Sequence, residues 1–353
     1  MMSIQVYVVD DSAVVRQTIM HLLEGDPELE LIGSAPNPLL AKPAIEKRPP
    51  DVLLLDIEMP GMDGLTFLRQ IMDSSPIPTV ICSTLTTDGS RMALDALAAG
   101  AVAVVAKPRI GLKQFLEESR RELTQTLKSA ARARPRRVSA PVAGPASTAA
   151  AAKAPAAVLH ALSVNKPVVI GASTGGTQAI ESVLTGLPAD CPGMAVVLHM
   201  PEKFTAMYAQ RLDTLCAMRV KEARDGDRLE RGQVLIAPGG RHMQLRKAAG
   251  QYFVAIADGP PVNRHKPSVD VLFRSAADCA GRDALAIILT GMGDDGARGM
   301  KAMHDLGART VAQDETTCVV YGMPKEAVAL GAVDRVVPLH HVAENIVAFD
   351  ARG

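Results

Sequence analysis

Short apolar runs alternate with amphipathic stretches along the first third of the chain. Five of these runs lie at 4–9, 29–35, 52–55, 79–82 and 102–105. Helical patterns lie between them, for example at 13–24 and 64–72. Runs that are apolar throughout are typical of parallel strands buried on both faces. Because crossovers between parallel strands are right-handed, these repeats predict a doubly wound α/β sheet with helices on both faces.

The same alternation returns in the second half of the chain and predicts another doubly wound α/β domain. Its strand candidates lie at 168–171, 195–199, 234–237, 253–257, 284–289 and 309–312. Between the halves the sequence RARPRRVSAPVAGPASTAAAAKAPAA holds no aromatic residue and cannot bury enough apolar surface to order itself. We therefore expect a first domain at 1–125, a flexible linker at 126–164 and a second domain at 165–353.

The charge and cysteine content exclude several classes of protein. The 38 basic and 38 acidic side chains cancel, so no net charge draws the chain to nucleic acid or to a membrane. The five cysteines are scattered without a CxxC pair, which argues against a disulfide framework or a cysteine-rich zinc site. The N-terminus lacks a signal-peptide pattern, and no apolar run reaches about 18 residues. These features predict a cytoplasmic protein without membrane insertion.

Polar side chains follow the expected strands of the first domain. Asp10 and Asp11 follow the first strand, Asp56 the third, Ser83 the fourth and Lys107 the fifth. Because ligands bind at the carboxyl ends of parallel strands, we expect these side chains to gather at one edge. Three carboxylates there favour a divalent cation with oxygen ligands, Mg²⁺ above all. Asp56 could then attack a phosphoryl group, while Lys107 and Ser83 donate to its oxygens.

The motifs VVDDS, LDIEMPGMDG and KP together make this segment similar to response-regulator receiver domains, which are flavodoxin-like. The resemblance implies that Asp56 is the phosphorylated residue. It also implies that Asp10, Asp11, Asp56 and the backbone carbonyl of Glu58 hold Mg²⁺. Val104 departs from the family, in which an aromatic switch residue is frequent at this position, so the route of the conformational signal stays open.

A glycine-rich turn joins a strand to a helix in PVVIGASTGGTQAIESVL, and Ser173 lies in that turn. Glycines let backbone N–H groups approach a ligand, and the helix N-terminus favours developing negative charge. Ser173 could therefore be a nucleophile beside an oxyanion site, although such a turn more often binds phosphate or caps a helix. GASTG fits the G-x-S-x-G nucleophile elbow of α/β-hydrolases, in which the acid of the triad precedes the histidine in the sequence. In this chain the candidate histidine comes before the candidate acids, so we expect a convergent triad on a different fold.

A nucleophilic serine needs a base and an orienting acid. His199 closes an apolar strand in GMAVVLHMP and would point into the crevice beside Ser173, whereas His242 and His265 are alternatives in loops. The loop in LTGMGDDGARGM supplies Asp294 and Asp295. These aspartates could instead cap the next helix, and spacing alone does not choose between the two roles.

GASTGG, LHMP and LTGMGDDGARGM together resemble the catalytic domain of chemotaxis protein-glutamate methylesterases, which is Rossmann-like. With the receiver, the resemblance covers the chain apart from the linker. It implies Ser173 as nucleophile, His199 as base and Asp295 as orienting acid, with no cofactor for the hydrolysis. It also places Thr174 beside the nucleophile and makes the Met292 backbone N–H an oxyanion donor.

The resemblance further implies hydrolysis of glutamate γ-methyl esters on methylated chemoreceptors and deamidation of certain receptor glutamines. A chemotaxis histidine kinase would be the phosphodonor, and phosphorylation would uncover a triad that the receiver covers at rest. Other interpretations are the same chemistry on a signalling protein outside chemotaxis, or a binding module without turnover. A nucleic-acid regulator is a third, suggested by basic residues at 128–137, but no recognition element accompanies them.

Overall fold

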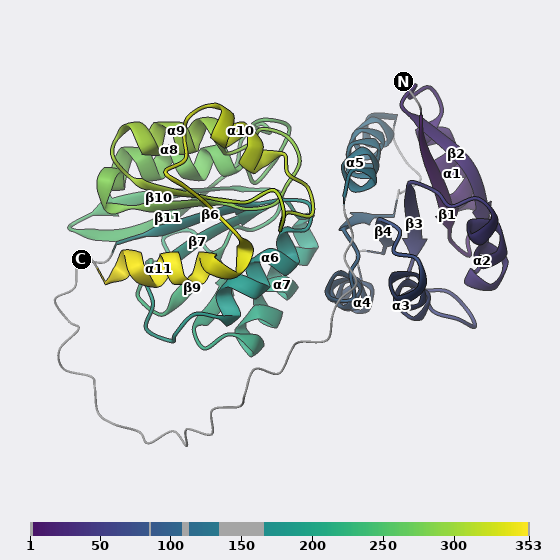
Figure 1. Cartoon of the computed structure of the whole chain (residues 1–353), viewed down its shortest axis with the longest axis horizontal. Helices are drawn as coiled ribbons and strands as arrows, with labels where there is room; N and C mark the ends of the chain where they lie inside the picture. Colours follow the sequence, from purple (N-terminus) through teal and green to yellow (C-terminus); the bar gives the residue numbers. More distant parts are fainter. Residues whose placement is uncertain (1–2, 85, 108–112, 134–165, 352–353) are drawn as a thin grey trace, which may run out of the picture.

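The computed structural model describes residues 3–84, 86–107, 113–133 and 166–351. They form two α/β domains, each built on its own parallel sheet (Figure 1). The two sheets confirm the fold class expected from the sequence. Within the described ranges, no helix combines the length and the apolarity needed to cross a membrane.

The N-terminal domain is a five-stranded parallel sheet in the order β2-β1-β3-β4-β5. Its strands are β1 (Ile4–Val9), β2 (Leu29–Ala35), β3 (Val52–Asp56), β4 (Thr79–Ser83) and β5 (Ala103–Ala106). Its helices are α1 (Ala13–Leu23), α2 (Pro38–Lys47), α3 (Gly64–Ser74), α4 (Thr87–Ala98) and α5 (Lys113–Ala131). All five residues of β3 are buried, which explains why that strand reads as a continuous apolar run.

Helix starts in this domain follow local capping chemistry. The side chain of Ser12 accepts the backbone N–H of Val15 at the start of α1, and Asn37, Asp63 and Thr86 cap α2, α3 and α4 in the same way. Capping fixes where each helix begins after its strand. It therefore fixes the short strand–helix loops at one edge of the sheet, where Asp10 and Asp56 lie.

The C-terminal domain is a seven-stranded parallel sheet in the order β14-β13-β12-β6-β7-β9-β8. Its strands are β6 (Val168–Ala172), β7 (Met194–Leu198), β8 (Arg219–Glu222), β9 (Gln233–Ile236), β12 (Leu285–Ile288), β13 (Arg309–Gln313) and β14 (Arg335–Val337). Its helices are α6 (Gly176–Thr185), α7 (Glu202–Leu215), α8 (Val269–Ala280), α9 (Ala297–Asp305), α10 (Met323–Ala329) and α11 (Val342–Asp350). The strand order reverses between β6 and β12, and a ligand crevice is expected at the carboxyl ends of these two strands.

An antiparallel hairpin, β10 (His242–Ala248) and β11 (Gln251–Ala257), stands apart from the parallel sheet. The expected strand at 253–257 belongs to this hairpin and not to the main sheet. The hairpin buries Met243 and Leu245 in one apolar cluster with Phe273 of α8. Edge strands β8 and β14 were not expected, because both are short and largely polar or exposed.

The two domains lie against each other through α4 and α5 of the N-terminal domain (Figure 1). Helix α5 continues to Ala131, so the first six residues of the expected linker at 126–164 are helical. The part of the expected linker from 134 onward lies outside the described residues, and so do most of the basic residues at 128–137.

Candidate active site

The turn after β6 places Ser173 in the crevice between β6 and β12. The Ser173 backbone N–H donates to the Thr290 carbonyl at 3.0 Å, which ties the two strand ends together. Gly175 is left-handed, with φ of 77°, and a Cβ there would lie 2.5 Å from Val319 Cβ. A side chain at Gly175 is therefore excluded, and the turn can lead directly into α6.

His199 lies directly after β7, beside Ser173, because Ala172 pairs with Leu198 in the parallel register. Its Nδ1 is 3.0 Å from Ser173 Oγ, and its Nε2 is 2.8 Å from Asp295 Oδ2. A carboxylate only accepts hydrogen bonds, so Nε2 carries the proton. The lone pair of Nδ1 is then free to accept the Ser173 hydroxyl, which is the arrangement that a serine nucleophile requires.

Asp295 is a buried carboxylate, 1% exposed, with a full set of hydrogen-bond donors. These donors are His199 Nε2, Asn263 Nδ2, Ser268 Oγ and the backbone N–H groups of Val269 and Asp270. The two backbone groups belong to the first turn of α8, where a negative charge is favoured. Burial raises the pKa of Asp295, but the bonds and charge of His199, Asn263 and Ser268 outweigh it, so the net pKa lies well below its usual range.

The two neighbouring aspartates differ in environment. Asp294 is half exposed and lies 3.9 Å from Arg298 of α9. Helix α9 begins at Gly296 without a side-chain cap, so neither aspartate side chain caps the next helix. Asp295 instead accepts the first two backbone N–H groups of α8 while it contacts His199.

The loop alternatives for the base lie in other environments. His242 is buried, with Nε2 at 3.0 Å from the Pro260 carbonyl and Nδ1 accepting the Ser268 backbone N–H, so both ring nitrogens are occupied. His265 stacks on His199, with ring centroids 3.6 Å apart. Neither ring is positioned in the described contacts to take a proton from Ser173.

Thr174 and Met292 both line the cavity beside Ser173. The Thr174 hydroxyl is 2.7 Å from Ser129 Oγ of α5, and the Met292 side chain packs with the apolar cluster of the N-terminal domain. Asn263, which bonds Asp295, was missed from the sequence. The only available signal was its place in the polar segment next to HKPSVD.

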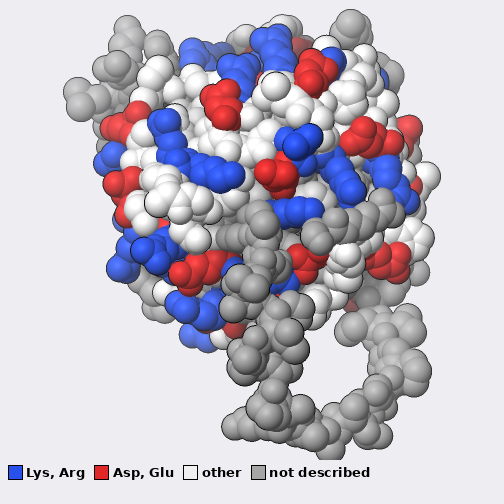
Figure 2. Space-filling model, turned by 90° about the vertical axis from the view of Figure 1, so that its left-hand side faces the viewer, with Lys and Arg blue, Asp and Glu red and all other residues white. Residues whose placement is uncertain are grey.

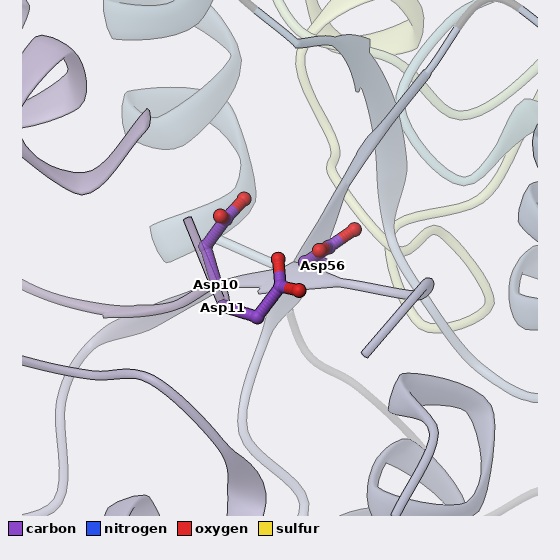
Figure 3. A group of neighbouring side chains, drawn as sticks. All are labelled: Asp10, Asp11 and Asp56. Atoms are coloured by element: carbon purple, nitrogen blue, oxygen red, sulfur yellow. The ribbon is translucent and has the colours of Figure 1, made fainter. Parts of the chain in front are cut away.

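A second cluster of polar side chains lies at the carboxyl ends of β1 and β3. One oxygen each from Asp10, Asp11 and Asp56 lie within 4.8 Å of one another (Figure 3). Lys107 Nζ is 2.7 Å from Asp56 Oδ2 and 3.1 Å from Asp10 Oδ2. Burial, only partly offset by Lys107 and reinforced by Asp10, raises the pKa of Asp56 to about 6.

This acidic cluster fits a magnesium site. Asp10 Oδ2 is buried and accepts no well-aligned hydrogen bond, even though Lys107 Nζ lies nearby. A buried carboxylate oxygen that lies near a cation but accepts no hydrogen bond, among further carboxylates, matches the oxygen ligands that Mg²⁺ prefers. Glu58 donates its backbone N–H to Asp56 at 3.2 Å, and the Ser83 hydroxyl donates to the Gly89 carbonyl at 3.0 Å.

The Ser173 site and Lys107 of the acidic cluster border one cavity of about 650 Å³ between the domains. Ser173, His199 and Met292 line it from the C-terminal domain, and Val104 and Lys107 line it from the N-terminal domain. The residue at the usual switch position therefore faces the cleft that holds Ser173.

Hydrogen bonds cross the domain boundary around this cleft. The backbone N–H of Gly175 donates to the Val102 carbonyl at 3.2 Å, and Gln178 Nε2 donates to the Leu97 carbonyl at 2.5 Å. Apolar side chains also cross this boundary, because Val319 and Val320 of the C-terminal domain pack in one cluster with Leu123 and Leu127 of α5. The N-terminal domain thus engages the same glycine turn that positions Ser173.

The comparison with known proteins decides the family. Residues 168–346 match the CheB methylesterase family, and residues 6–118 match the response regulator receiver domain. The chain belongs to the CheB methylesterase family. This methylesterase is 56% identical, over 96% of its length and 99% of the relative's, to "Protein-glutamate methylesterase/protein-glutamine glutaminase 2" of Xanthomonas campestris pv. campestris.

Two further relatives support the assignment of both halves. The methylesterase is 54% identical to "Protein-glutamate methylesterase/protein-glutamine glutaminase 1" of Chromobacterium violaceum, over 98% of its own chain and 99% of the relative. Its C-terminal domain is similar to the crystal structure of the Thermotoga maritima CheB methylesterase catalytic domain. That match has 38% identity and a TM-score of 0.51, and covers 52% of this chain and 98% of the other.

Proposed function

We propose that this methylesterase hydrolyses γ-methyl esters of glutamate on chemoreceptors and deamidates certain receptor glutamines, and so acts in sensory adaptation. The observation that carries the proposal is the hydrogen-bonded series from Ser173 Oγ through His199 to Asp295. Ser173 is the nucleophile, His199 the general base and Asp295 the residue that fixes the tautomer of His199.

In the first half-reaction Ser173 Oγ attacks the ester carbonyl carbon while His199 Nδ1 takes the hydroxyl proton. The C–O bond to the methoxy group then breaks, and methanol leaves with the proton from His199. The Met292 backbone N–H stabilises the oxyanion beside Thr174, and the N-terminus of α6 favours the negative charge that develops there. Water then attacks the acyl-enzyme by the same route and releases glutamate. With glutamine as substrate, ammonia leaves in place of methanol.

The receiver residues have a separate chemistry. Asp56 accepts the phosphoryl group, with Lys107 as its neighbouring cation. Asp10, Asp11, Asp56 and the Glu58 carbonyl would hold Mg²⁺, which supplies neutralising charge for the incoming phosphoryl group. Ser83 completes the pocket once its hydroxyl rotates away from the Gly89 carbonyl.

The receiver controls access to Ser173 by docking over the cleft. The contacts of α5 with Thr174 in the turn and of α4 with Gln178 of α6 favour the covered state. Phosphorylation of Asp56 shifts the docking equilibrium, and each tenfold change in the open population requires about 1.4 kcal/mol of differential stability. The receiver at 1–125 and the catalytic domain at 165–353 are joined by the linker proposed at 126–164. Its first six residues belong to α5, and the rest of the linker would constrain the docking only weakly.

The proposal includes a cytoplasmic location, a methylated chemoreceptor as substrate and a chemotaxis histidine kinase as phosphodonor. Nucleic acid is not a partner. The face of the C-terminal domain in Figure 2 interleaves Lys and Arg with Asp and Glu, without a broad basic patch. Action on another signalling protein would keep the same chemistry and change only the substrate.

The test is methanol release from methylated receptor membranes, for the wild type and Ser173→Ala, with and without acetyl phosphate and Mg²⁺. We expect Ser173-dependent release that rises with the phosphodonor. Release that depends on Ser173 but not on the phosphodonor would refute control by the receiver. No release above the Ser173→Ala background would leave a different substrate or a binding module.

A further inference from the structure

A tight turn lies beside the hydrolytic site. Val262 and His265 exchange backbone hydrogen bonds of 3.0 and 2.9 Å around two left-handed residues, Asn263 with φ of 50° and Arg264 with φ of 71°. Glycine is preferred at the second position of such a turn, and an arginine there is held against its steric preference. Strained backbone of this kind is typical of segments that position functional groups.

The turn directs two side chains onto the proposed triad. Asn263 Nδ2 is 2.8 Å from Asp295 Oδ1 and 2.8 Å from Asp270 Oδ2, so one amide bridges two buried carboxylates. The His265 ring lies almost parallel to the His199 ring, at a centroid distance of 3.6 Å and an interplanar angle of 10°. One short segment thus contacts both the acid and the base.

We propose that His265 is a positioning residue for the hydrolytic reaction. The inference rests on the proposed roles of Ser173 and His199. The stacked ring holds His199 in the plane in which Nδ1 faces Ser173 and Nε2 faces Asp295.

The need for such support follows from the chemistry of the base. Two hydrogen bonds, at opposite ends of the His199 ring, leave it able to tilt about the line that joins them. Once Ser173 is acylated, its hydroxyl no longer bonds Nδ1, so Asp295 alone holds the ring by hydrogen bonding. His199 must nevertheless protonate methanol and then activate water from the same position. The stack on His265 persists through both steps and blocks the tilt on one side.

The electrostatic environment keeps this support uncharged. Burial, and next the neighbouring His199, lower the pKa of His265 to about 3, with Arg264 acting in the same direction and Asp295 against it. A neutral ring presents a π face to the imidazolium that forms on His199, and this contact is attractive. A second cation at the same distance would oppose proton transfer to His199.

The test compares His265→Ala, His265→Gln and His265→Phe in the full-length chain, with Arg264→Gly as a matched control in the same turn. Two rates are measured with acetyl phosphate and Mg²⁺ present: methanol release from receptor membranes, and phosphonylation of Ser173 by a fluorophosphonate. The second rate reports the Ser173–His199 pair without any receptor. Circular dichroism establishes that each variant is folded.

We expect His265→Ala and His265→Gln to lower kcat and the phosphonylation rate about tenfold while KM stays within about twofold. His265→Phe, which keeps a flat neutral ring, should restore both rates to within about threefold of the wild type. Arg264→Gly should leave phosphonylation unchanged.

The proposal would be overturned if folded His265→Ala or His265→Gln kept wild-type rates. It would also be overturned if folded His265→Phe were as slow as the alanine and glutamine variants. Should His265→Ala fail to fold, His265→Gln and His265→Phe decide the question. Equal slowing by Arg264→Gly would assign the effect to the turn and not to the stack. Methanol release that persists in Ser173→Ala would refute the proposed function itself, an outcome distinct from all of these.

Discussion

Replacing Asp295 by asparagine tests the site most directly, and the adjacent Asp294 offers a matched control. Asp295 is buried with five hydrogen-bond donors, whereas Asp294 is half exposed beside Arg298. Asp295→Asn and Asp294→Asn therefore make the same change, one carboxylate oxygen to an NH₂ group, at neighbouring positions. We expect it to be severe at the first and nearly silent at the second.

The magnitude follows from the two oxygens of Asp295. In Asp295→Asn one oxygen becomes an NH₂ group. If that group replaces Oδ2, it meets the Val269 backbone N–H and His199 Nε2, so a hydrogen bond to a charged acceptor worth about 1.5–3 kcal/mol is lost. Loss of charge at the start of α8 costs about 0.3–1 kcal/mol more. The total of about 3 kcal/mol should lower the melting temperature of the domain by roughly 10 °C.

The chemical effect is larger than the stability effect. The new amide donates to Nε2 of His199, which places the ring proton on Nδ1, where it faces Ser173 and cannot accept the hydroxyl proton. A wrong tautomer of this kind lowers kcat on the order of 10⁴-fold in serine triads. Asp294→Asn should change stability by less than about 0.5 kcal/mol and leave kcat unchanged.

The assays are methanol release under phosphodonor, at a temperature where both variants are folded, and thermal unfolding followed by circular dichroism. Asp295→Asn that keeps kcat within tenfold of the wild type would refute the assigned tautomer. Equal loss of activity in Asp294→Asn would show that the loop as a whole, and not the contact with His199, is responsible.

Three further outcomes are expected. Ser129→Ala removes the 2.7 Å bond to Thr174, so methanol release without phosphodonor should rise about two- to tenfold, and an unchanged rate would exclude that bond from docking. Asp56→Asn should keep basal release but abolish its rise with acetyl phosphate; a persisting rise would place the phosphoryl group elsewhere. Because the pKa of His265 is about 3 in the folded state and about 6.5 when unfolded, only the unfolded state binds the proton between these values, and stability falls as pH falls through this window. In His265→Phe the free energy of unfolding, measured by urea titration, should fall less steeply with falling pH, by up to about 1.4 kcal/mol per pH unit. The same pH dependence in the wild type and the variant would contradict a buried neutral His265 ring.

The arrangement of the parallel sheets was predictable because their strands are buried on both faces. A short run that is apolar throughout, such as 52–55, is typical of a strand buried on both faces. It is followed directly by a polar residue, which marks the end of the strand. The proximity of Asp56 to Asp10, and of Ser173 to His199, follows from parallel pairing, which brings the carboxyl ends of neighbouring strands to one edge.

Other features depend on contacts that leave no periodic signal. Asp294 and Asp295 have the same side chain in one glycine-rich loop, and only the path of that loop past α8 decides which one is buried. Asn263 reaches Asp295 through a turn whose left-handed residues are not the glycines that usually mark one. The β10–β11 hairpin has strand-like sequence, but nothing in that sequence says which sheet it joins.

Under the proposed function the receiver and a receptor helix would compete for the surface around Ser173, since α5 contacts Thr174 next to the proposed nucleophile. Thermodynamic linkage makes such competition reciprocal. A substrate that displaces α5 therefore stabilises the undocked receiver by the same factor by which undocking favours substrate. Methylated receptors would then promote phosphorylation of the enzyme that demethylates them, and this promotion would fade as their esters are consumed.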